Sequence, residues 1–409
     1  MSHVAELRRP LQGLRVLDLS RVLAGPYAAM LLGDAGADVV KVEPPAGDDT
    51  RQWGPPWAGG ESAYYLSCNR NKRGMVLDLS RPEGQAVVRR LVSQADVLIE
   101  NFKLGTMERW GLGYEDVLRS LNPGLVYCNI SGFGRTGPYR EWPGYDFAIQ
   151  AIGGLMSVTG EPGGEPMKVG VAISDLTTGM MAAFAIMAAL RARDLSGEGQ
   201  RVDLSLLETQ VAWLANVASG YLVCGEPPRR YGNAHPNIAP YQAFRARDRE
   251  FVVAVGNDRQ FQRFCRLLGR PELAQNARFA TNPDRVGNRA ALIQEIQPAL
   301  LERDADEWLE LMKAQGIPGA PINTLDRVFA DPQVIHRQMV QEIDHPTAGR
   351  VRVVGLPIKF GDMPGEIRRH PPLLGEHTGE VLREAGYSAE DVESLFEAGV
   401  VTTLARFRS

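Results

Sequence analysis

Cysteine and histidine are scarce in this 409-residue chain, and their scarcity excludes several kinds of site. The four cysteines, at positions 68, 128, 224 and 265, are far apart and form no Cys-x-x-Cys pair. Their spacing indicates neither a zinc site nor a redox motif, so we expect reduced packing residues and no bound metal. The six histidines leave the whole interval between His3 and His235 without an imidazole.

An excess of charge of one sign is also lacking. The 45 basic and 49 acidic residues give a net charge of −4, which predicts neither a nucleic-acid nor a membrane-surface partner. The longest uncharged apolar run follows Asp175; it is too short for a bilayer and predicts a core helix. The first twenty residues lack the apolar core of a secretory signal. We therefore expect a cytoplasmic enzyme.

Short runs rich in β-branched residues alternate with helical patterns in the first half of the chain, which predicts an α/β fold with a parallel sheet. The expected strands cover 14–20, 37–43, 74–80, 95–101 and 125–131. The expected helices between them include 25–36, where Pro26 suits a first helical turn, and 81–95.

A second, smaller α+β unit is predicted after an apolar helix at 202–222 and a loop-rich break at 224–240. Its expected elements are a strand at 249–257, a helix at 259–269 and two helices within 288–316. The tail carries a strand signal at 349–360 and helices at 378–386 and 389–399. We predict a large domain at 1–205, a linker helix at 206–225, a small domain at 226–325 and a C-terminal segment at 326–409.

One Gly-x-Gly-x-x-Gly pattern, "GFGRTG" at 132–137, follows the expected strand 125–131. A dinucleotide-binding motif needs a helix to begin at once, with its N-terminus at the pyrophosphate. Pro138 and "YREWPGYD" predict a loop instead. We expect no nicotinamide cofactor, and interpret the segment as a backbone loop near another phosphate or a thioester.

Asp175 is the only charged residue between Gly170 and Arg191. Aspartate favours the N-cap position, so we predict a helix that begins at Leu176 or Thr177 with Asp175 as its cap. The helix dipole and free N–H groups would keep such a carboxylate ionised at neutral pH. An ionised carboxylate can also act as a nucleophile.

Several further segments, in this order and spacing, resemble the class III CoA-transferases, the family of formyl-CoA transferase, carnitine CoA-transferase and the α-methylacyl-CoA racemases. They include "VLDLSRVLAGPYAAMLLGDAGADVVKVE", "CNRNKRGMVLDL", "ADVLIENF", "GYDFAIQAIGGLMSVTG", "GVAISDLTTG", "SGEGQRVDLSLLE" and "PLLGEHTGEVL". The resemblance covers nearly the whole chain. It implies a Rossmann-like large domain, a smaller domain, a C-terminal segment that returns to the large domain, and an interlocked homodimer.

The resemblance places the catalytic aspartate of the family at Asp175. That residue would attack an acyl-CoA thioester, form an aspartyl mixed anhydride, and then carry CoA as an aspartyl thioester. CoA and acyl-CoA are implied as substrates, with no permanently bound cofactor. Water must be excluded from the anhydride, and an apolar setting serves that purpose.

Matching the family segments implies CoA contacts from seven residues: Val22, Leu23, Lys72, Arg73, Asn101, Phe102 and Arg109. Basic side chains suit the CoA phosphates, although each cation alone is equally typical of a solvated surface. Where the family often has Arg after "KVE", this chain has Pro44, and Lys41 or Arg51 is expected to substitute.

The racemase branch needs a His before an Asp, and this chain has Tyr145 before Asp146. Tyr145 is therefore assigned to the acyl site of a transferase. "GNAHPNIAPYQAF" lacks the glycine run of the formyl branch and resembles the dicarboxylate branch, such as succinyl-CoA:glutarate CoA-transferase. His235 is a candidate for binding a remote carboxylate, or a loop histidine with a structural hydrogen bond. The alternatives are an acyl-CoA racemase or isomerase, and a CoA-binding homologue without turnover.

Overall fold

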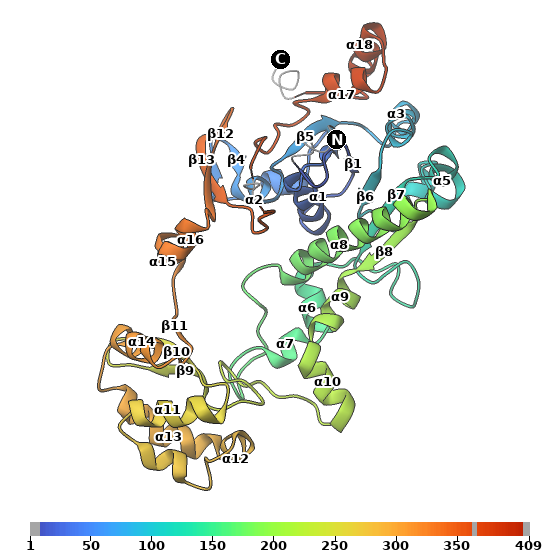
Figure 1. Cartoon of the computed structure of the whole chain (residues 1–409). Helices are drawn as coiled ribbons and strands as arrows, with labels where there is room; N and C mark the ends of the chain where they lie inside the picture. Colours follow the sequence, from blue (N-terminus) through green and yellow to red (C-terminus); the bar gives the residue numbers. More distant parts are fainter. Residues whose placement is uncertain (1–8, 362–365, 404–409) are drawn as a thin grey trace, which may run out of the picture. The chain divides into compact units, whose positions relative to one another are not determined.

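A computed structural model describes residues 9–361 and 366–403 of the chain (Figure 1). Residues 1–8 lie outside the described residues. They belong to the N-terminal stretch that we predicted not to be a secretory signal. Contacts divide the chain into two compact units, each described by itself below. The larger unit comprises residues 1–155, 169–219 and 333–409, and the smaller unit comprises 156–168 and 220–332. The segment 156–168 was predicted within the large domain, and the structure corrects this assignment.

A six-stranded parallel sheet forms the centre of the larger unit, in the order β5-β2-β1-β6-β7-β8. The strands are β1 (Arg15–Asp18), β2 (Asp38–Glu43), β5 (Lys72–Val76), β6 (Val97–Glu100), β7 (Val126–Ser131) and β8 (Arg201–Ser205). Five of them confirm predicted strands, though with shifted ends. The sixth was missed, because residues 202–205 were taken as the start of a helix.

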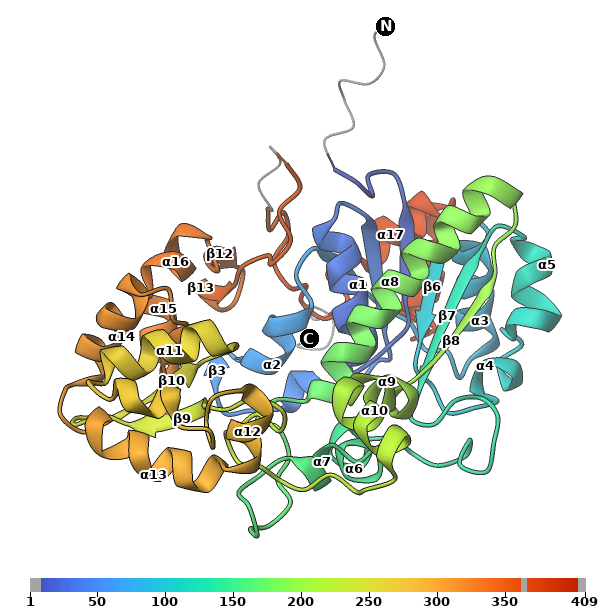
Figure 2. The ribbon, with the colours of Figure 1, turned by 60° about the horizontal axis from the view of Figure 1, so that its bottom comes forward.

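Side chains of successive strand residues enter two separate cores, as the twofold period of a strand requires. Val16 faces one core, which includes α1 (Ala24–Asp34) and α8 (Ile173–Ser196), and Leu17 faces the other. Figure 2 shows α1 and α8 side by side. The second core includes α3 (Pro82–Val92) and α17 (Thr378–Glu384), so the sheet is covered on both faces.

The larger unit has further short elements around this sheet. They are η1 (Asp49–Gln52), β3 (Trp57–Ala58), β4 (Glu61–Ser62), α2 (Ala63–Cys68), α4 (Thr106–Arg109), η2 (Tyr114–Leu118), α5 (Arg119–Leu121), α6 (Asp146–Ile152), α9 (Leu206–Trp213), β12 (Val340–His345), β13 (Gly349–Val354) and α18 (Ala389–Glu397). Three helices, α7 (Leu155–Val158), α10 (Ala215–Cys224) and α16 (Pro332–His336), contain a boundary between the units.

Helix α8 contains the apolar run that follows Asp175. Among the described residues it alone has the length and composition of a membrane span, because the helix extends beyond the uncharged run that follows Asp175. It packs on α1, β7, β8 and α9, and 44% of its most apolar window is buried. These contacts support the prediction of a core helix.

The smaller unit pairs a three-stranded antiparallel sheet with helices over a separate core of buried apolar residues. Its elements are β9 (Tyr241–Arg245), β10 (Glu250–Ala254), α11 (Asp258–Leu267), η3 (Pro271–Gln275), α12 (Asn282–Gly287), α13 (Arg289–Leu300), α14 (Ala305–Ala314), β11 (Gly319–Pro321) and α15 (Leu325–Ala330). The predicted strand at 249–257 and the helices at 259–269 and 288–316 are confirmed, whereas β9 and β11 were missed.

Candidate active site

A cavity of about 390 Å³ lies in the larger unit, beyond the carboxyl ends of the parallel strands. The strand order reverses between β1 and β6, and ligands of open α/β sheets bind outside such a switch point. The loops that follow β1, β6 and β7 line this cavity. Its lining includes the predicted site residues Val22, Leu23, Asn101, Phe102, Arg109, Tyr145 and Asp175.

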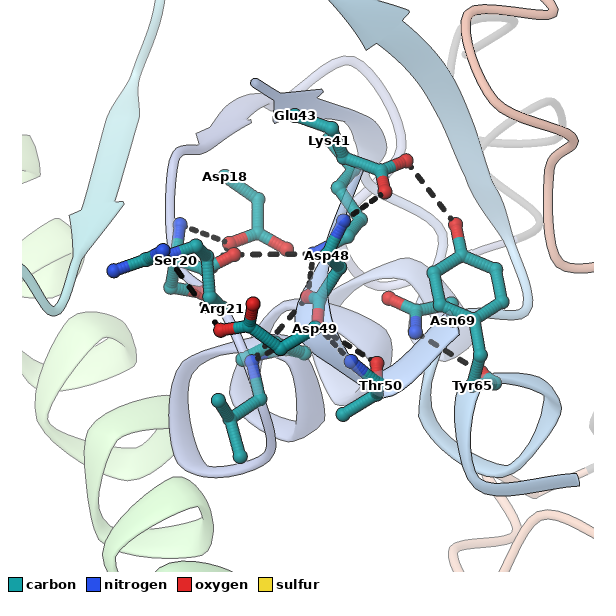
Figure 3. A network of polar contacts seen from close by, with 12 residues as sticks. Asp18, Ser20, Arg21, Lys41, Glu43, Asp48, Asp49, Thr50, Tyr65 and Asn69 are labelled. Atoms are coloured by element: carbon teal, nitrogen blue, oxygen red, sulfur yellow. Dashed lines mark hydrogen bonds and ion pairs between the residues drawn. The ribbon is translucent and has the colours of Figure 1, made fainter. Parts of the chain in front are cut away.

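A buried ion pair between Lys41 and Asp48 supports the loop after β1 (Figure 3). Val22 has φ +70°, a strained conformation for a β-branched residue. Its N–H lies 3.3 and 3.4 Å from the two carboxylate oxygens of Asp48. Lys41 Nζ donates to Asp48 Oδ2 at 2.9 Å and to the carbonyl of Ser20 at 3.0 Å. This pair therefore fixes the backbone that lines the cavity.

Both members of the pair are charged in the folded protein. Burial raises the pKa of Asp48, but Lys41 and the bonds from Thr50 outweigh it and lower that pKa to about 2. Burial also acts to lower the pKa of Lys41, and the surrounding carboxylates raise it overall. Arg51 is engaged as well, by two 2.7 Å bonds to Glu43. Both side chains that we expected in place of the family Arg at Pro44 are therefore engaged within the protein, and a contact of either with CoA stays a prediction.

Lys72 and Arg73 also have protein partners. Lys72 is fully buried in β5, where its Nζ donates to Asp18 at 3.0 Å and to Asn69 at 2.9 Å. Arg73 donates to Asp38, and at 2.8 Å to both Glu380 and Glu384. Neither residue lines the cavity with Asp175. Both side chains serve internal ion pairs, and their predicted contacts with CoA stay a prediction.

The segment after β6 carries three more of the predicted CoA-binding residues, Asn101, Phe102 and Arg109. Asn101 accepts from the N–H of Arg21 at 2.9 Å and donates to its carbonyl at 2.8 Å, so the two loops at the switch point are joined. The N–H of Phe102 donates to Glu100 at 2.7 Å. Arg109 donates to Thr106 at 2.9 Å and lines the cavity.

Sequence analysis missed eight polar residues of this cavity: Arg21, Asp49, Lys103, Asn129, Ser131, Arg135, Arg140 and Glu141. The side chain of Asn129 is 2% exposed, and its Oδ1 has no partner among the described residues. The available signal was position, since most of them follow strands whose carboxyl ends face the cavity and Asn129 lies in the second half of β7. Gly132 and Gly134 line it too, as expected of a loop near a phosphate or thioester.

Asp175 is the third residue of α8, which begins at Ile173, so the predicted N-cap is wrong. The cap comes from a distant residue, because Asp146 Oδ1 accepts from the N–H of Ser174 at 2.8 Å. Asp146 Oδ2 accepts from Gln150 at 2.7 Å. No described group donates a hydrogen bond to the Asp175 carboxylate.

Electrostatics of Asp175 also differ from the expectation. Burial, with a contribution from the Asp146 charge, raises the pKa of Asp175 from 3.8 to about 7. Asp175 is therefore only partly ionised at neutral pH, contrary to the prediction, because burial and the Asp146 charge both disfavour the carboxylate. A carboxyl with this pKa exchanges its proton near neutrality, which is typical of a reactive group.

A close helix contact places Asp175 against the loop after β1. A Cβ atom on Gly179 would lie 2.6 Å from the carbonyl oxygen of Ala24, so only glycine permits this approach of α8 to α1. Tyr145 is 69% exposed and lines the cavity immediately before Asp146.

His235 lies in the smaller unit. Its Nδ1 accepts from the N–H of Asn237 at 3.1 Å, and its ring contacts Tyr241 with centroids 5.3 Å apart. Burial and Arg289 lower the pKa of His235, which favours a neutral ring. These contacts fit the alternative of a loop histidine with a structural hydrogen bond.

Comparisons with known proteins match this geometry to one family. The family model described as CoA-transferase family III matches residues 11–378. Succinyl-CoA:glutarate CoA-transferase of Homo sapiens is 44% identical over 395 residues, covering 96% of this chain and 90% of that protein. Succinate–glutarate CoA-transferase of Agrobacterium fabrum is 47% identical over 391 residues, covering 94% and 98%.

Solved structures give the same result. A CAIB/BAIF family protein from Brucella suis is 48% identical with a TM-score of 0.81, covering 92% of this chain and 99% of that one. The hypothetical protein Rv3272 from Mycobacterium tuberculosis is 31% identical with a TM-score of 0.81, covering 91% and 99%.

Proposed function

Because the chain belongs to CoA-transferase family III, we propose that it transfers CoA from succinyl-CoA to a dicarboxylic acid such as glutarate. The observation that carries the mechanism is Asp175, a partly buried carboxyl with a pKa of about 7 at a cavity lined by both cations and carboxylates. The names of the relatives support the two acids.

The ionised Asp175 attacks the thioester carbonyl of succinyl-CoA. The C–S bond breaks, CoA leaves as a thiolate, and a succinyl–aspartyl anhydride forms. The thiolate then attacks the aspartyl carbonyl, which releases succinate and leaves CoA on Asp175 as a thioester. Glutarate reverses these two steps and leaves as glutaryl-CoA. A serine would form an oxygen ester, from which CoA is hard to recover, whereas a carboxylate conserves the thioester energy.

The cavity residues serve CoA in distinct ways. Lys103 and Arg109 have no carboxylate partner among the described residues and are suited to its phosphates. Arg21, Arg135 and Arg140 also line the cavity, and each pairs with a carboxylate, Asp49, Glu108 and Glu141 respectively. The unpartnered Oδ1 of Asn129 is suited to accept from an amide N–H of the pantetheine arm. The backbone of Val22 and Leu23 borders the same space. CoA is a substrate here, and the proposal requires no resident cofactor.

Assembly as an interlocked homodimer is part of this proposal. Met180, Met181, Phe184 and Met187 on α8 are 39–68% exposed in the single chain. Patches of large exposed apolar residues mark interaction surfaces, and a second copy would cover this one. Light scattering should give twice the chain mass of 44.9 kDa. We also propose that the protein is cytoplasmic.

The mechanism is tested by trapping the enzyme thioester. Succinyl-CoA is incubated with the protein, the adduct is treated with hydroxylamine or borohydride, and the modified peptide is located by mass spectrometry. The adduct should map to Asp175 and be lost in Asp175→Asn. Asp194→Asn, an exposed aspartate on the same helix, is the matched control. An adduct elsewhere, or none during turnover, contradicts the mechanism.

Racemisation or isomerisation is the second candidate, because it uses the same family fold. Deuterium uptake at the α-carbon of an acyl-CoA in the absence of acceptor acid would favour it. Tyr145, in place of a histidine before Asp146, weighs against this activity. Acyl-CoA consumption that Asp175→Asn leaves unchanged would instead favour a CoA-binding homologue without turnover at this residue.

A further inference from the structure

Glu100 is a buried carboxyl that immediately precedes the cavity-lining segment after β6. It is the last residue of that strand, and Asn101 and Phe102 follow it into the lining of the cavity of Asp175. Glu100 itself is 2% exposed. Burying a carboxyl costs free energy unless its oxygens are hydrogen-bonded, so the partners of Glu100 indicate what it does.

Two donors occupy the two oxygens of this carboxyl. The N–H of Phe102 donates to Glu100 Oε2 at 2.7 Å, and the hydroxyl of Tyr127 on β7 donates to Oε1 at 3.0 Å. The first bond closes a turn between the end of β6 and the segment that lines the cavity. The second bond ties the same carboxyl to the neighbouring strand. The backbone position of Phe102 therefore depends on Glu100.

Phe102 passes this position on to the cavity. Its ring meets Trp110 edge-on with centroids 5.1 Å apart, and the guanidinium of Arg21 lies 5.9 Å from its centroid. Asn101, one residue earlier, is hydrogen-bonded in both directions to the backbone of Arg21. The segment 100–102 therefore joins β6 to the loop after β1, and it borders the space that we assign to CoA.

The charge state of Glu100 is balanced near neutral pH. Burial raises its pKa from 4.5 to about 7, against the two hydrogen bonds and the charge of Arg135, which lower it. The charge of Glu108, which is paired with Arg135, acts to raise it. Cys128 is a further titratable neighbour on β7, and burial raises the pKa of its thiol, which therefore stays neutral.

We propose that Glu100 is a positioning residue for CoA, whose ionised carboxylate holds the segment at Phe102 in its binding conformation. The inference rests on the proposed function, because it takes the cavity of Asp175 as the CoA site. A hydrogen bond to a charged acceptor is roughly twice as strong as one to a neutral acceptor. Protonated Glu100 therefore holds Phe102 less firmly, and CoA should bind more tightly as the pH rises through about 7.

Glutamine at position 100 imitates the protonated state at every pH, because its amide offers one acceptor to Phe102 and one donor to Tyr127. Free CoA is titrated by calorimetry into the full-length Asp175→Asn protein, a background that removes turnover and the ionisation of Asp175. Adding Glu100→Gln should weaken binding about fivefold at pH 8 and less than about twofold at pH 6.

Two controls isolate the contribution of Glu100. The 3′-phosphate of CoA also titrates, near a pKa of about 6, but it does so with every variant, so the difference between variants is the readout. Glu198→Gln changes an exposed glutamate just after α8 and should leave CoA binding as it was at both pH values. Circular dichroism and urea unfolding check that each variant is folded.

Tyr127→Phe gives a second, independent test. It removes the hydroxyl that favours the ionised carboxyl and leaves the bond from Phe102 in place. The pH at which CoA affinity changes should therefore move upward. A residue with only a structural role would weaken CoA binding equally at both pH values and would leave this transition where it was.

Three outcomes would overturn the inference. They are unchanged CoA binding by Glu100→Gln at pH 8, a loss of equal size at pH 6 and pH 8, and tighter binding, which would show that Glu100 only repels the phosphates. Any of these with CoA transfer by the wild-type protein refutes the inference alone. CoA binding that depends on Glu100 without transfer between acids refutes the proposed function alone. Absence of CoA binding at every pH refutes both.

Discussion

Replacing Asp175 by asparagine should stabilise the folded protein at alkaline pH while it abolishes transfer. Burial, with a contribution from Asp146, raises the pKa of Asp175 from 3.8 to about 7. In the unfolded chain water surrounds this carboxyl, which then loses its proton near its ordinary pKa of about 4. Between these two values the folded protein holds a proton that the unfolded chain has released.

The sign of the effect follows from this difference. Since the folded state binds more protons in this interval, the contribution of Asp175 to stability falls as pH rises from about 4 to about 7. A shift of about three units corresponds to roughly 4 kcal/mol as an upper bound, at about 1.4 kcal/mol per unit. Asp175 borders a cavity, so water screens part of this penalty, and we expect about 1–3 kcal/mol. Asparagine carries no charge and avoids the penalty.

Urea unfolding at pH 5 and pH 8, at one fixed protein concentration, measures the gain. The stabilisation by Asp175→Asn at pH 8 should be at least about twice that at pH 5, where only part of the penalty has developed. Asp194→Asn should change stability by about 0.5 kcal/mol and equally at both pH values. A gain that does not grow with pH, or a loss at pH 8, would show that Asp175 ionises normally in the folded protein.

Three further predictions concern the same cavity. The kcat/KM for succinyl-CoA should be at least about tenfold higher at pH 8 than at pH 6, because only ionised Asp175 is a nucleophile. Asp146→Asn should move this limb of the pH profile to lower pH, and an unmoved limb contradicts the assigned cause. Gly179→Ala should lower the melting temperature and the activity, since its Cβ meets a backbone carbonyl that cannot yield; a variant with wild-type melting would refute the close contact. Lys72→Met should destabilise the fold by about 3–5 kcal/mol, because it leaves the buried Asp18 carboxylate without its partner. Lys103→Met should leave the free energy of unfolding unchanged and raise the KM for CoA thioesters. A raised KM in Lys72→Met with unchanged stability would instead place Lys72 in the CoA site.

Local pattern was sufficient for most of the fold. Alternating strand and helix periods predicted five of the six parallel strands. It failed at residues 202–205, where a short strand runs directly into α9 and no turn residue separates the two periods. The chemistry of Asp175 depended on one further signal, a single acid at the start of an apolar run, together with the family resemblance.

Only the tertiary structure decided which charges are available and which are engaged. Lys72 and Arg73 have the composition of a phosphate site, but Asp18 and Glu380 are distant in sequence and neutralise them in space. The pKa of Asp175 likewise depends on burial and on Asp146, neither of which a local pattern contains. Sequence by itself determined which residue types lie where the strands end. The fold determined their partners and hydration, because Coulomb interactions and desolvation depend on distance in space rather than along the chain.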